Sequence, residues 1–374
     1  MIEKKTFKLF IISGEPSGDT LGAGIINELK KSTHIKNLLI NGVGGSKMIS
    51  NGLDSIFPME EISLMGIAEI VPKIFKLNKL INKCVDEIHK FKPDAILTID
   101  SPEFNFRVLK RVRKKNKTFK HFHYVAPSVW AWRGGRAKSI KKYVDHLFCL
   151  FSFEKKFFDF PTTFVGHPIL NEKLPIIDEG FIRKYDLNRE KKYLVILPGS
   201  RVKEINSLLP IFVNSAKKIE EHYGLEPIVI SLDKNKEIIK KYFDGKIITG
   251  NDEKWKALQL CECAIAASGT VTLELLKSNT PSVICYKVDF LTYNIVKNLI
   301  RTKYVGLPNI ISGKKIMPEL LQDNCTENNI FNEMSALLDD IQNIKSNIIN
   351  VSNSVKVDFD ASKKVSDIIL ESKF

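Results

Sequence analysis

The chain has 374 residues, of which 44% are hydrophobic and 27% charged, and its formal net charge is +14. This length and composition predict two globular domains and exclude a disordered or fibrous chain. The sequence contains no apolar run of 18 residues and its six cysteines form no CxxC pair, which argues against a membrane span, a zinc site and a disulfide framework. The apolar run at residues 9–12 is too short for a signal peptide, so we expect a cytoplasmic protein.

The positive charge is concentrated in one part of the chain. Residues 104–144 contain 13 Lys and Arg residues and no Asp or Glu. A field of one sign in one window favours an anionic partner, which could be nucleic acid, an acidic membrane surface or a phosphorylated substrate. A solvated basic surface is the alternative.

The first predicted unit is a strand at residues 7–12, a turn at residues 13–19 that contains Glu15 and Ser17, and a helix to about Lys31. A second strand, at residues 38–43, ends in another glycine-rich turn. This order is typical of a doubly wound α/β domain, whose ligands lie at the carboxyl ends of the strands. Neither GxGxxG nor GK[ST] is present, so the sequence does not favour a dinucleotide or P-loop site.

Residues 62–91 form a long amphipathic segment that is interrupted near Pro72. Apolar residues recur at helical spacing, with Lys73, Lys76, Lys79 and Lys83 on another face. Such a helix can lie on a bilayer surface, or it can be a crossover helix packed on the sheet.

A third strand, at residues 95–99, is followed directly by Asp100. A carboxylate at this strand end could take a proton from an attacking hydroxyl, although an Asx-type turn is the alternative. Glu103 is better explained as a partner of the helix dipole. After the strand at residues 121–125, two tryptophans stand beside Arg133 and Arg136, which could bind a sugar and a phosphate or face a membrane.

A second series of strands and helices begins at residues 193–197. Gly199, Ser200 and Arg201 follow that strand, and small residues with one arginine suit a diphosphate. Further strands are expected at residues 228–232, 247–249, 264–267 and 282–285. A helix is expected at residues 318–322, ending at Gln322, where it could present polar groups to the same cleft. The DxD at residues 358–360 follows no predicted strand, so we assign it no metal.

The stretch from residue 263 to 276 predicts a strand, a turn and a helix start. Ser268 is suited to cap the helix, Gly269 would let a ligand approach the backbone, and N–H groups after Thr270 would face an anionic guest such as phosphate. Glu274, one turn further on, could accept hydrogen bonds from ribose hydroxyls. A capped helix with a solvated glutamate is the alternative.

Together these segments resemble the lipid-A-disaccharide synthases, inverting glycosyltransferases of the two-domain GT-B fold. The matching segments are GEPSGD at 14–19, DSPEFN at 100–105, PSVWAWR at 127–133, LPGSR at 197–201, SGT at 268–270 with Glu274, and LPN at 307–309. Pro16 and Glu103 stand where a small residue and Asp are more usual, which removes no functional group. The resemblance implies two doubly wound Rossmann-like domains that face an interdomain cleft.

The resemblance also implies a reaction. UDP-2,3-diacylglucosamine would donate its sugar to the 6-hydroxyl of 2,3-diacylglucosamine 1-phosphate, giving a β-1,6 disaccharide and UDP. Asp100 would be the base, and Glu15, Ser17 and Asn309 would be further cleft residues, to which the helix expected at residues 318–322 adds Gln322. The diphosphate and ribose would bind to Gly199, Ser200, Arg201, Ser268, Gly269, Thr270 and Glu274. No metal or other cofactor is implied.

The same resemblance suggests where the protein works. Arg133 and Arg136 would belong to a basic surface that meets the acceptor and anionic lipid, with the protein peripheral on the cytoplasmic face of the inner membrane. We expect domains at 1–167 and 168–350, and a helical segment at 351–374 that packs back on the first domain or on a partner subunit of a homodimer. Another UDP-sugar enzyme, a peptidoglycan-type transferase or an epimerase, remains an alternative, and a basic nucleic-acid-binding protein is a more distant one.

Overall fold

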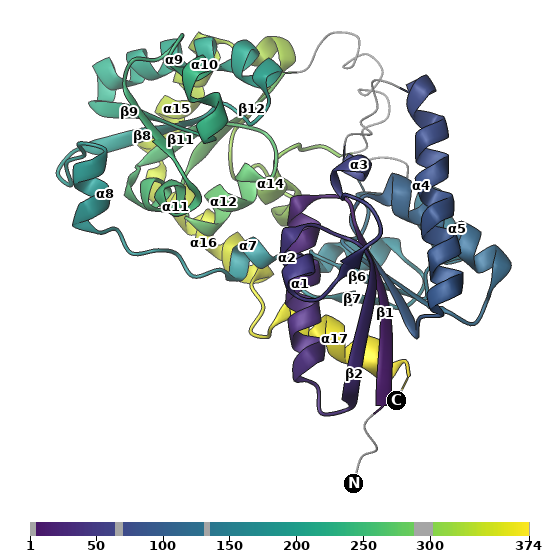
Figure 1. Cartoon of the computed structure of the whole chain (residues 1–374). Helices are drawn as coiled ribbons and strands as arrows, with labels where there is room; N and C mark the ends of the chain where they lie inside the picture. Colours follow the sequence, from purple (N-terminus) through teal and green to yellow (C-terminus); the bar gives the residue numbers. More distant parts are fainter. Residues whose placement is uncertain (1–4, 64–69, 131–134, 288–301, 374) are drawn as a thin grey trace. The chain divides into compact units, whose positions relative to one another are not determined.

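The computed structural model describes residues 5–63, 70–130, 135–287 and 302–373. The chain divides into two compact units: unit 1 is Met1–His167 with Val357–Phe374, and unit 2 is Pro168–Lys356. Each unit is built around one parallel sheet with helices on its faces (Figure 1). Among the described residues, no helix combines the length and apolar character needed to cross a bilayer.

Unit 1 contains a seven-stranded parallel sheet. Its strands, in spatial order, are β3 (Asp54–Ser55), β2 (Ile35–Val43), β1 (Lys5–Ser13), β4 (Ala95–Ile99), β5 (Lys120–Tyr124), β6 (His146–Cys149) and β7 (Thr162–Phe164). The order reverses direction at β1 and β4, where Ser13 pairs with Ile99. The chain segments that leave these two strands therefore start at the same edge of the sheet, which is where doubly wound folds place their ligands.

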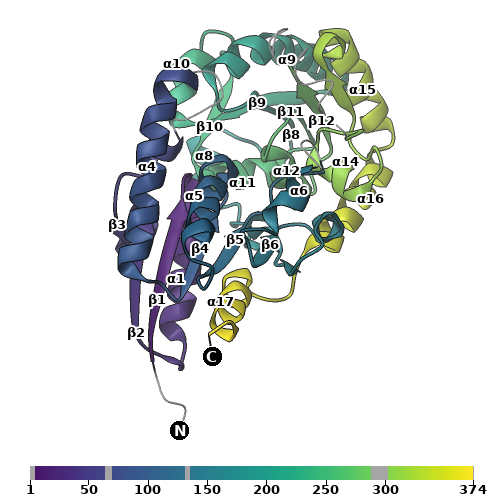
Figure 2. The same ribbon diagram turned by 90° about the vertical axis from the view of Figure 1, so that its right-hand side faces the viewer.

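Helices cover both faces of this sheet because successive strand residues point to opposite sides. Phe10 and Ile12 pack in a core with α4 (Ile70–Phe91), α5 (Pro102–Lys115) and α6 (Gly135–Ile140). Leu9 and Ile11 face the other core, with α1 (Pro16–Lys31) and α17 (Ala361–Glu371). Figure 2 shows α4 and α5 together on one side of the strands. The short helices α2 (Ser46–Ser50) and α3 (Glu60–Ser63) follow β2 and β3.

The last helix of the chain belongs to unit 1. α17 packs along α1, and the Ser366 hydroxyl donates a hydrogen bond of 3.2 Å to the carbonyl of Ile25. Ser362 also lies close to Gly24, where an added Cβ would come within 2.5 Å of the serine hydroxyl. The end of the chain therefore completes the core of the unit that the start of the chain builds.

Unit 2 contains a six-stranded parallel sheet. Its strands, in spatial order, are β10 (Lys246–Thr249), β9 (Leu225–Ser231), β8 (Lys192–Leu197), β11 (Cys263–Ala267), β12 (Ser282–Tyr286) and β13 (Glu319–Leu321). Its helices are α7 (Pro168–Asn171), α8 (Glu179–Lys184), α9 (Val202–Tyr223), α10 (Lys236–Ile239), α11 (Asn251–Leu260), α12 (Val271–Lys277), α14 (Leu307–Ser312), α15 (Glu327–Asp339) and α16 (Ile341–Val355). Apolar residues of α9 and α15 share one core with alternate residues of β8, β9 and β11.

Two local predictions were wrong. Residues 318–322 do not form a helix, since Glu319–Leu321 is strand β13 and Gln322 begins a 3-10 turn with a φ of 52°. Pairing of β13 with β12 decides this segment, because the N–H of Ile284 donates to the carbonyl of Pro318. Ser268 is not the helix cap, because α12 begins at Val271 with Thr270 in the cap position.

Candidate active site

The candidate nucleotide site is a cavity of about 530 Å³ in unit 2. It lies where β8, β9, β10 and β11 end, as expected for a doubly wound sheet. The structure brings the following predicted residues around it: Gly199, Ser200, Arg201, Ser268, Gly269, Thr270 and Glu274. Residues from two distant parts of the sequence, 199–201 and 268–274, thus share one site because their strands are neighbours in the sheet.

The loop after β8 places an arginine at the rim of this cavity. Gly199 has a φ of +98°, and a side chain there would meet the Glu204 carboxylate at 2.6 Å, so glycine is required. The Arg201 side chain is 82% exposed, and its guanidinium lies 3.0 Å from Glu204 Oε1. An ion pair this exposed is worth little, so the guanidinium can turn to an anionic ligand at small cost.

The Glu274 carboxylate is held by a lysine that has no role in the sequence-based prediction. Lys254 Nζ lies 2.6 Å from Glu274 Oε1, and the two side chains are only 19% and 14% exposed. Lys254 lies in the first turns of α11, directly after β10. Its position after a strand could have identified it as a candidate site residue from the sequence. The pair fixes the carboxylate at the cavity wall, where its oxygens can accept further hydrogen bonds.

The backbone around Gly269 is open. Its φ is +157°, and a Cβ built there would contact nothing within 4 Å, which leaves room for a ligand against the chain. Ser268 instead donates from its hydroxyl to the carbonyl of Val305 at 3.4 Å, so its side chain ties two loops together.

Asn309 and Gln322 do not line this cavity. Asn309 is fully buried, and its amide donates to the carbonyl of Met317 and to Glu319, both at 2.7 Å. Its oxygen accepts from the N–H groups of Ile316 and Met317. The structure therefore gives Asn309 the role of fixing the segment between α14 and β13.

The Asp100 carboxylate stands at the end of β4 in unit 1. Asp100 and Ser101 both adopt left-handed conformations, with φ values of 49° and 42°, so the chain turns sharply before α5. The carboxylate is half-buried, and burial raises its pKa above the ordinary value, although the N–H of Ser101 opposes the change. A carboxylate with a raised pKa is a stronger base once it is ionised.

A buried asparagine holds this turn. Asn105 is 0% exposed, and its amide donates to the carbonyl of Asp100 at 2.7 Å and to that of Ile99 at 3.2 Å. The DSPEFN segment was recognised in the sequence, but the role of Asn105 becomes visible only when the turn is seen.

The turn after β1 lies beside Asp100. A Cβ added to Gly14 would come within 2.5 Å of the Ser101 hydroxyl, so only glycine lets the two loops approach. Glu15 and Ser17 follow at the exposed start of α1. Asp19, to which the sequence pattern assigned no role, is buried and accepts from the N–H groups of Gly45, Lys47 and Met48.

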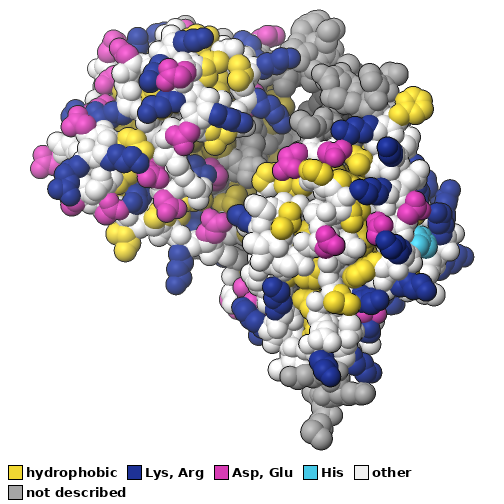
Figure 3. Space-filling view, viewed as in Figure 1, with side chains coloured by type: hydrophobic (Ala, Val, Ile, Leu, Met, Phe, Trp, Pro, Cys, Tyr) yellow, Lys and Arg dark blue, Asp and Glu magenta, His cyan; other side chains and the backbone are white. Residues whose placement is uncertain are grey.

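The basic surface is described only in part. Arg133 lies outside the described residues, while Arg136 forms an ion pair with Glu103. Glu103 therefore has a side-chain partner in addition to its place in the first turn of α5. Figure 3 shows Lys and Arg side chains gathered on the α4 and α5 side of unit 1.

A buried carboxylate supports the loop that carries Trp130. Glu154 is 3% exposed and accepts from the Trp130 indole at 3.2 Å and from the N–H groups of Leu150 and Phe151 at 3.0 Å. Burial raises the pKa of Glu154 to about 7, against the opposing effect of these donors.

In the part of the chain that the structure describes, no group of acidic, His and Cys side chains is arranged to hold a metal.

Solved structures with the same fold define the class of protein. UDP-GlcNAc 2-epimerase from Neisseria meningitidis, solved with UDP-GlcNAc, aligns over 98% of this chain and 99% of its own with a TM-score of 0.64 and 12% identity. The spinosyn rhamnosyltransferase SpnG aligns over 97% and 99% with a TM-score of 0.56 and 10% identity. The fold is therefore the two-domain α/β type of GT-B glycosyltransferases and epimerases, as expected from the sequence.

Sequence comparison identifies the family within this class. The family model described as lipid-A-disaccharide synthetase matches residues 9–368. The lipid-A-disaccharide synthase of Idiomarina loihiensis is 36% identical over 97% of both chains, and that of Rickettsia bellii is 38% identical over 88% of both. This chain belongs to the lipid-A-disaccharide synthetase family. The resemblance drawn from the motifs is confirmed, an enzyme of lipid A disaccharide synthesis is the supported function, and the epimerase and nucleic-acid alternatives are not favoured.

Proposed function

We propose that the chain transfers the sugar of UDP-2,3-diacylglucosamine to the 6-hydroxyl of 2,3-diacylglucosamine 1-phosphate, forming the β-1,6 disaccharide 1-phosphate and UDP. The observation that carries this proposal is the cavity of unit 2, whose wall is formed by the residues expected to hold UDP. Membership in the family supplies the substrate class.

The wall of the cavity offers a candidate contact for each part of the UDP group. Arg201 would take a diphosphate oxygen in exchange for its exposed contact with Glu204. The open backbone at Gly269 allows a phosphate to approach closely. Glu274, held by Lys254, would accept hydrogen bonds from the ribose hydroxyls.

Asp100 is the proposed general base. Inversion at the sugar requires a single displacement, so one group must take the proton of the acceptor hydroxyl as the bond to the anomeric carbon forms and the bond to UDP breaks. Departure of UDP is helped by cationic groups at the diphosphate, of which Arg201 is the candidate. Asp100 suits the first task because its turn is rigidly held and its pKa is raised by burial.

The acylated substrates imply contact with a membrane surface. Phe75 on α4 is 81% exposed, and exposed lysines follow on the same helix, among them Lys79 and Lys83. Ile67 and the neighbouring residues 64–69 lie outside the described residues, and the side chains of residues 70–74 are not described either. We propose that α4 and the basic surface bind the anionic cytoplasmic face of the inner membrane. Failure of the protein to float with anionic vesicles at low salt would refute this part.

Substitution of the proposed base tests the mechanism. Asp100→Asn should lower kcat by about 10²–10⁴-fold, because general-base catalysis contributes about that much, while UDP binding stays unchanged. Asp54→Asn is the matched control, since Asp54 is exposed on edge strand β3 of the same unit. Full activity of the Asp100→Asn enzyme would remove Asp100 from the role of base.

A further inference from the structure

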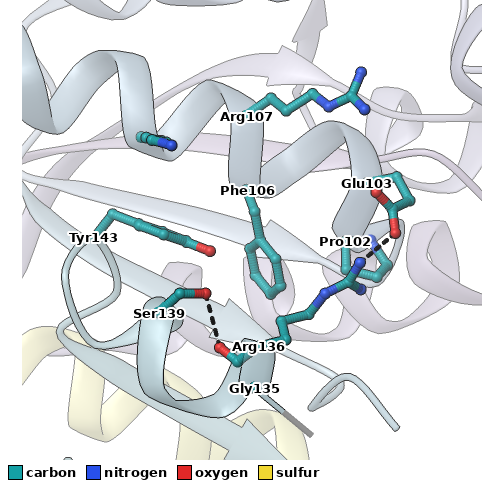
Figure 4. Close-up of a pocket in the computed structure, with 9 residues that line it drawn as sticks. Pro102, Glu103, Phe106, Arg107, Gly135, Arg136, Ser139 and Tyr143 are labelled. Atoms are coloured by element: carbon teal, nitrogen blue, oxygen red, sulfur yellow. Dashed lines mark hydrogen bonds and ion pairs between the residues drawn. The ribbon is translucent and has the colours of Figure 1, made fainter. Parts of the chain in front are cut away.

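Unit 1 contains a second cavity, of about 430 Å³, between α5 and α6 (Figure 4). Residues at successive turns of α5 face it, and α6 with the segment after it forms the opposite wall. The residues that line it are Pro102, Glu103, Phe106, Arg107, Lys110, Gly135, Arg136, Ser139 and Tyr143. Neither the nucleotide cavity nor the proposed base accounts for this site, which shares Arg136 with the basic surface.

The cavity has an excess of positive charge. Among the described residues that line it, Arg107, Lys110 and Arg136 are cationic and Glu103 is the single carboxylate. The net formal charge of its lining is therefore +2. A phosphate monoester carries about −1.5 to −2 charges at neutral pH, which matches this excess.

The two members of the ion pair between Arg136 and Glu103 differ in their exposure to solvent. The Arg136 side chain is 15% exposed, whereas that of Glu103 is 53% exposed. The guanidinium is thus held inside the cavity while the carboxylate reaches solvent. A ligand phosphate can share the guanidinium with Glu103, because one guanidinium has five N–H donors.

The remaining walls suit a sugar phosphate. Phe106 is buried, and its ring centroid lies 5.6 Å from that of Tyr143, so the two rings form an apolar wall. Burial raises the pKa of Tyr143, so its phenol stays protonated at neutral pH. The Ser139 hydroxyl donates to the carbonyl of Arg136 at 2.9 Å and fixes the first turn of α6 (Figure 4).

We propose that this cavity binds the 1-phosphate of the sugar acceptor, with Arg107, Lys110 and Arg136 as its cationic contacts. The inference rests on the proposed function, because it assigns the acceptor a position relative to Asp100. Pro102 and Glu103 line the cavity and begin α5 immediately after the Asp100 turn.

The cationic residues of α5 lie further from the Asp100 turn than Pro102 does. Arg107 stands five residues after Pro102, about 7.5 Å along the helix axis at ~1.5 Å per residue. In the proposed complex the phosphate would lie at Arg107 and Lys110, further along α5 from the Asp100 turn, with the sugar between them.

The charge balance distinguishes the acceptor from membrane lipid. A phosphodiester headgroup carries a single negative charge and would leave the cavity with unbalanced positive charge. A terminal phosphate monoester also presents three oxygens to the three cations. The acceptor is thus the better match for the cavity, while headgroups remain the other source of phosphate to be tested.

The double variant Arg107→Gln/Lys110→Gln tests the inference. Both side chains are exposed, so the fold should tolerate the change. The matched control is Lys363→Gln/Lys364→Gln, which removes two exposed charges from α17 of the same unit. The assay uses neutral detergent micelles without a bilayer, with the acceptor 2,3-diacylglucosamine 1-phosphate and with the same sugar lacking the phosphate.

We expect the double variant to raise the KM for the phosphorylated acceptor by about 10–100-fold, since two charge-assisted hydrogen bonds are lost. The KM for the donor should not change, and activity on the acceptor without phosphate should match that of the wild type. An unchanged KM, or an equal loss with both acceptors, would overturn the inference. A loss seen only on anionic vesicles would also overturn it, because the cavity would then bind headgroups.

Calorimetric binding of the phosphorylated acceptor, in micelles and without donor, separates this inference from the proposed function. If the wild type binds the acceptor and the double variant does not, the phosphate site stands even where no transfer occurs. If the wild type turns over and both proteins bind the acceptor equally, the transfer reaction stands and the phosphate site is wrong.

Discussion

Asn105→Ala tests whether the turn that carries Asp100 is held by a single buried side chain. The substitution removes two hydrogen bonds, of 2.7 Å to the carbonyl of Asp100 and 3.2 Å to the carbonyl of Ile99. It also removes support from two consecutive residues with positive φ, a conformation that costs an L residue about 1–2 kcal/mol.

The expected loss of stability follows from these contacts. A buried acceptor left without its donor costs about 1–3 kcal/mol, so the two together should cost about 2–4 kcal/mol when partial relaxation is allowed. For a domain of this size, that corresponds to a fall in Tm of about 5–15 °C. A displacement of Asp100 by about 1 Å would also lower kcat by about 10²-fold.

Thermal unfolding and steady-state kinetics measure the two effects separately. Asn37→Ala is the control, because Asn37 is exposed on β2 and the same atoms are removed. We expect the Asn105 variant to lose kcat at temperatures where it is still folded, with the donor KM unchanged. A folded variant with normal kcat would show that the turn does not depend on Asn105 and that the base is not held rigidly by it.

Three further changes have defined outcomes. Glu274→Gln should weaken UDP binding by about tenfold, because the acceptor of the ribose hydrogen bonds loses its charge and Lys254 loses its ion-pair partner, and titration with UDP would measure it; an unchanged affinity would exclude contact with the ribose. Gly199→Ala should weaken UDP binding and lower stability by about 1–2 kcal/mol, because its φ is +98° and the new methyl group meets Glu204; normal binding and stability would contradict this. Burial lowers the pKa of His123 to about 3. Below pH ~6.5 the unfolded chain therefore takes up a proton that the folded chain does not. The free energy of unfolding falls as the pH drops toward 3, and the loss is about 2 kcal/mol at pH 5. Denaturant titrations at several pH values measure this dependence. In His123→Leu the free energy of unfolding should fall less steeply between pH 6.5 and pH 3 than in the wild type. An unchanged slope would show that His123 does not titrate in this way.

The central strands of the two sheets were predictable because they are short apolar runs that end in small or polar residues. Residues 95–99 and 264–267 are buried throughout, as a central parallel strand requires, and the adjoining Asp100 and Ser268 lie at the strand ends. The prediction of a helix at residues 318–322 was wrong because a proline followed by residues such as Glu and Leu also begins many helices. Its strand pairing with β12 comes from a distant part of the chain and leaves no local pattern.

The grouping of the candidate site residues around one cavity was predictable where it follows from their position in the sheet. The loops after β8 and β11 lie side by side because those strands are neighbours in the sheet, and this places Arg201 and Gly269 around the same cavity. The partners that hold the functional groups were not predictable, because they come from elsewhere in the fold. Lys254 contacts Glu274 from another helix. The Asn309 side chain makes buried hydrogen bonds beside β13 and is not available to a ligand.

The proposed transfer reaction is tested most directly by measuring UDP release from UDP-2,3-diacylglucosamine with and without 2,3-diacylglucosamine 1-phosphate. We expect release only when both substrates are present, equimolar formation of a β-1,6 disaccharide 1-phosphate, and loss of release in Asp100→Asn with UDP binding retained. Release of UDP without the acceptor, or conversion of the donor to its 2-epimer, would contradict the proposed reaction.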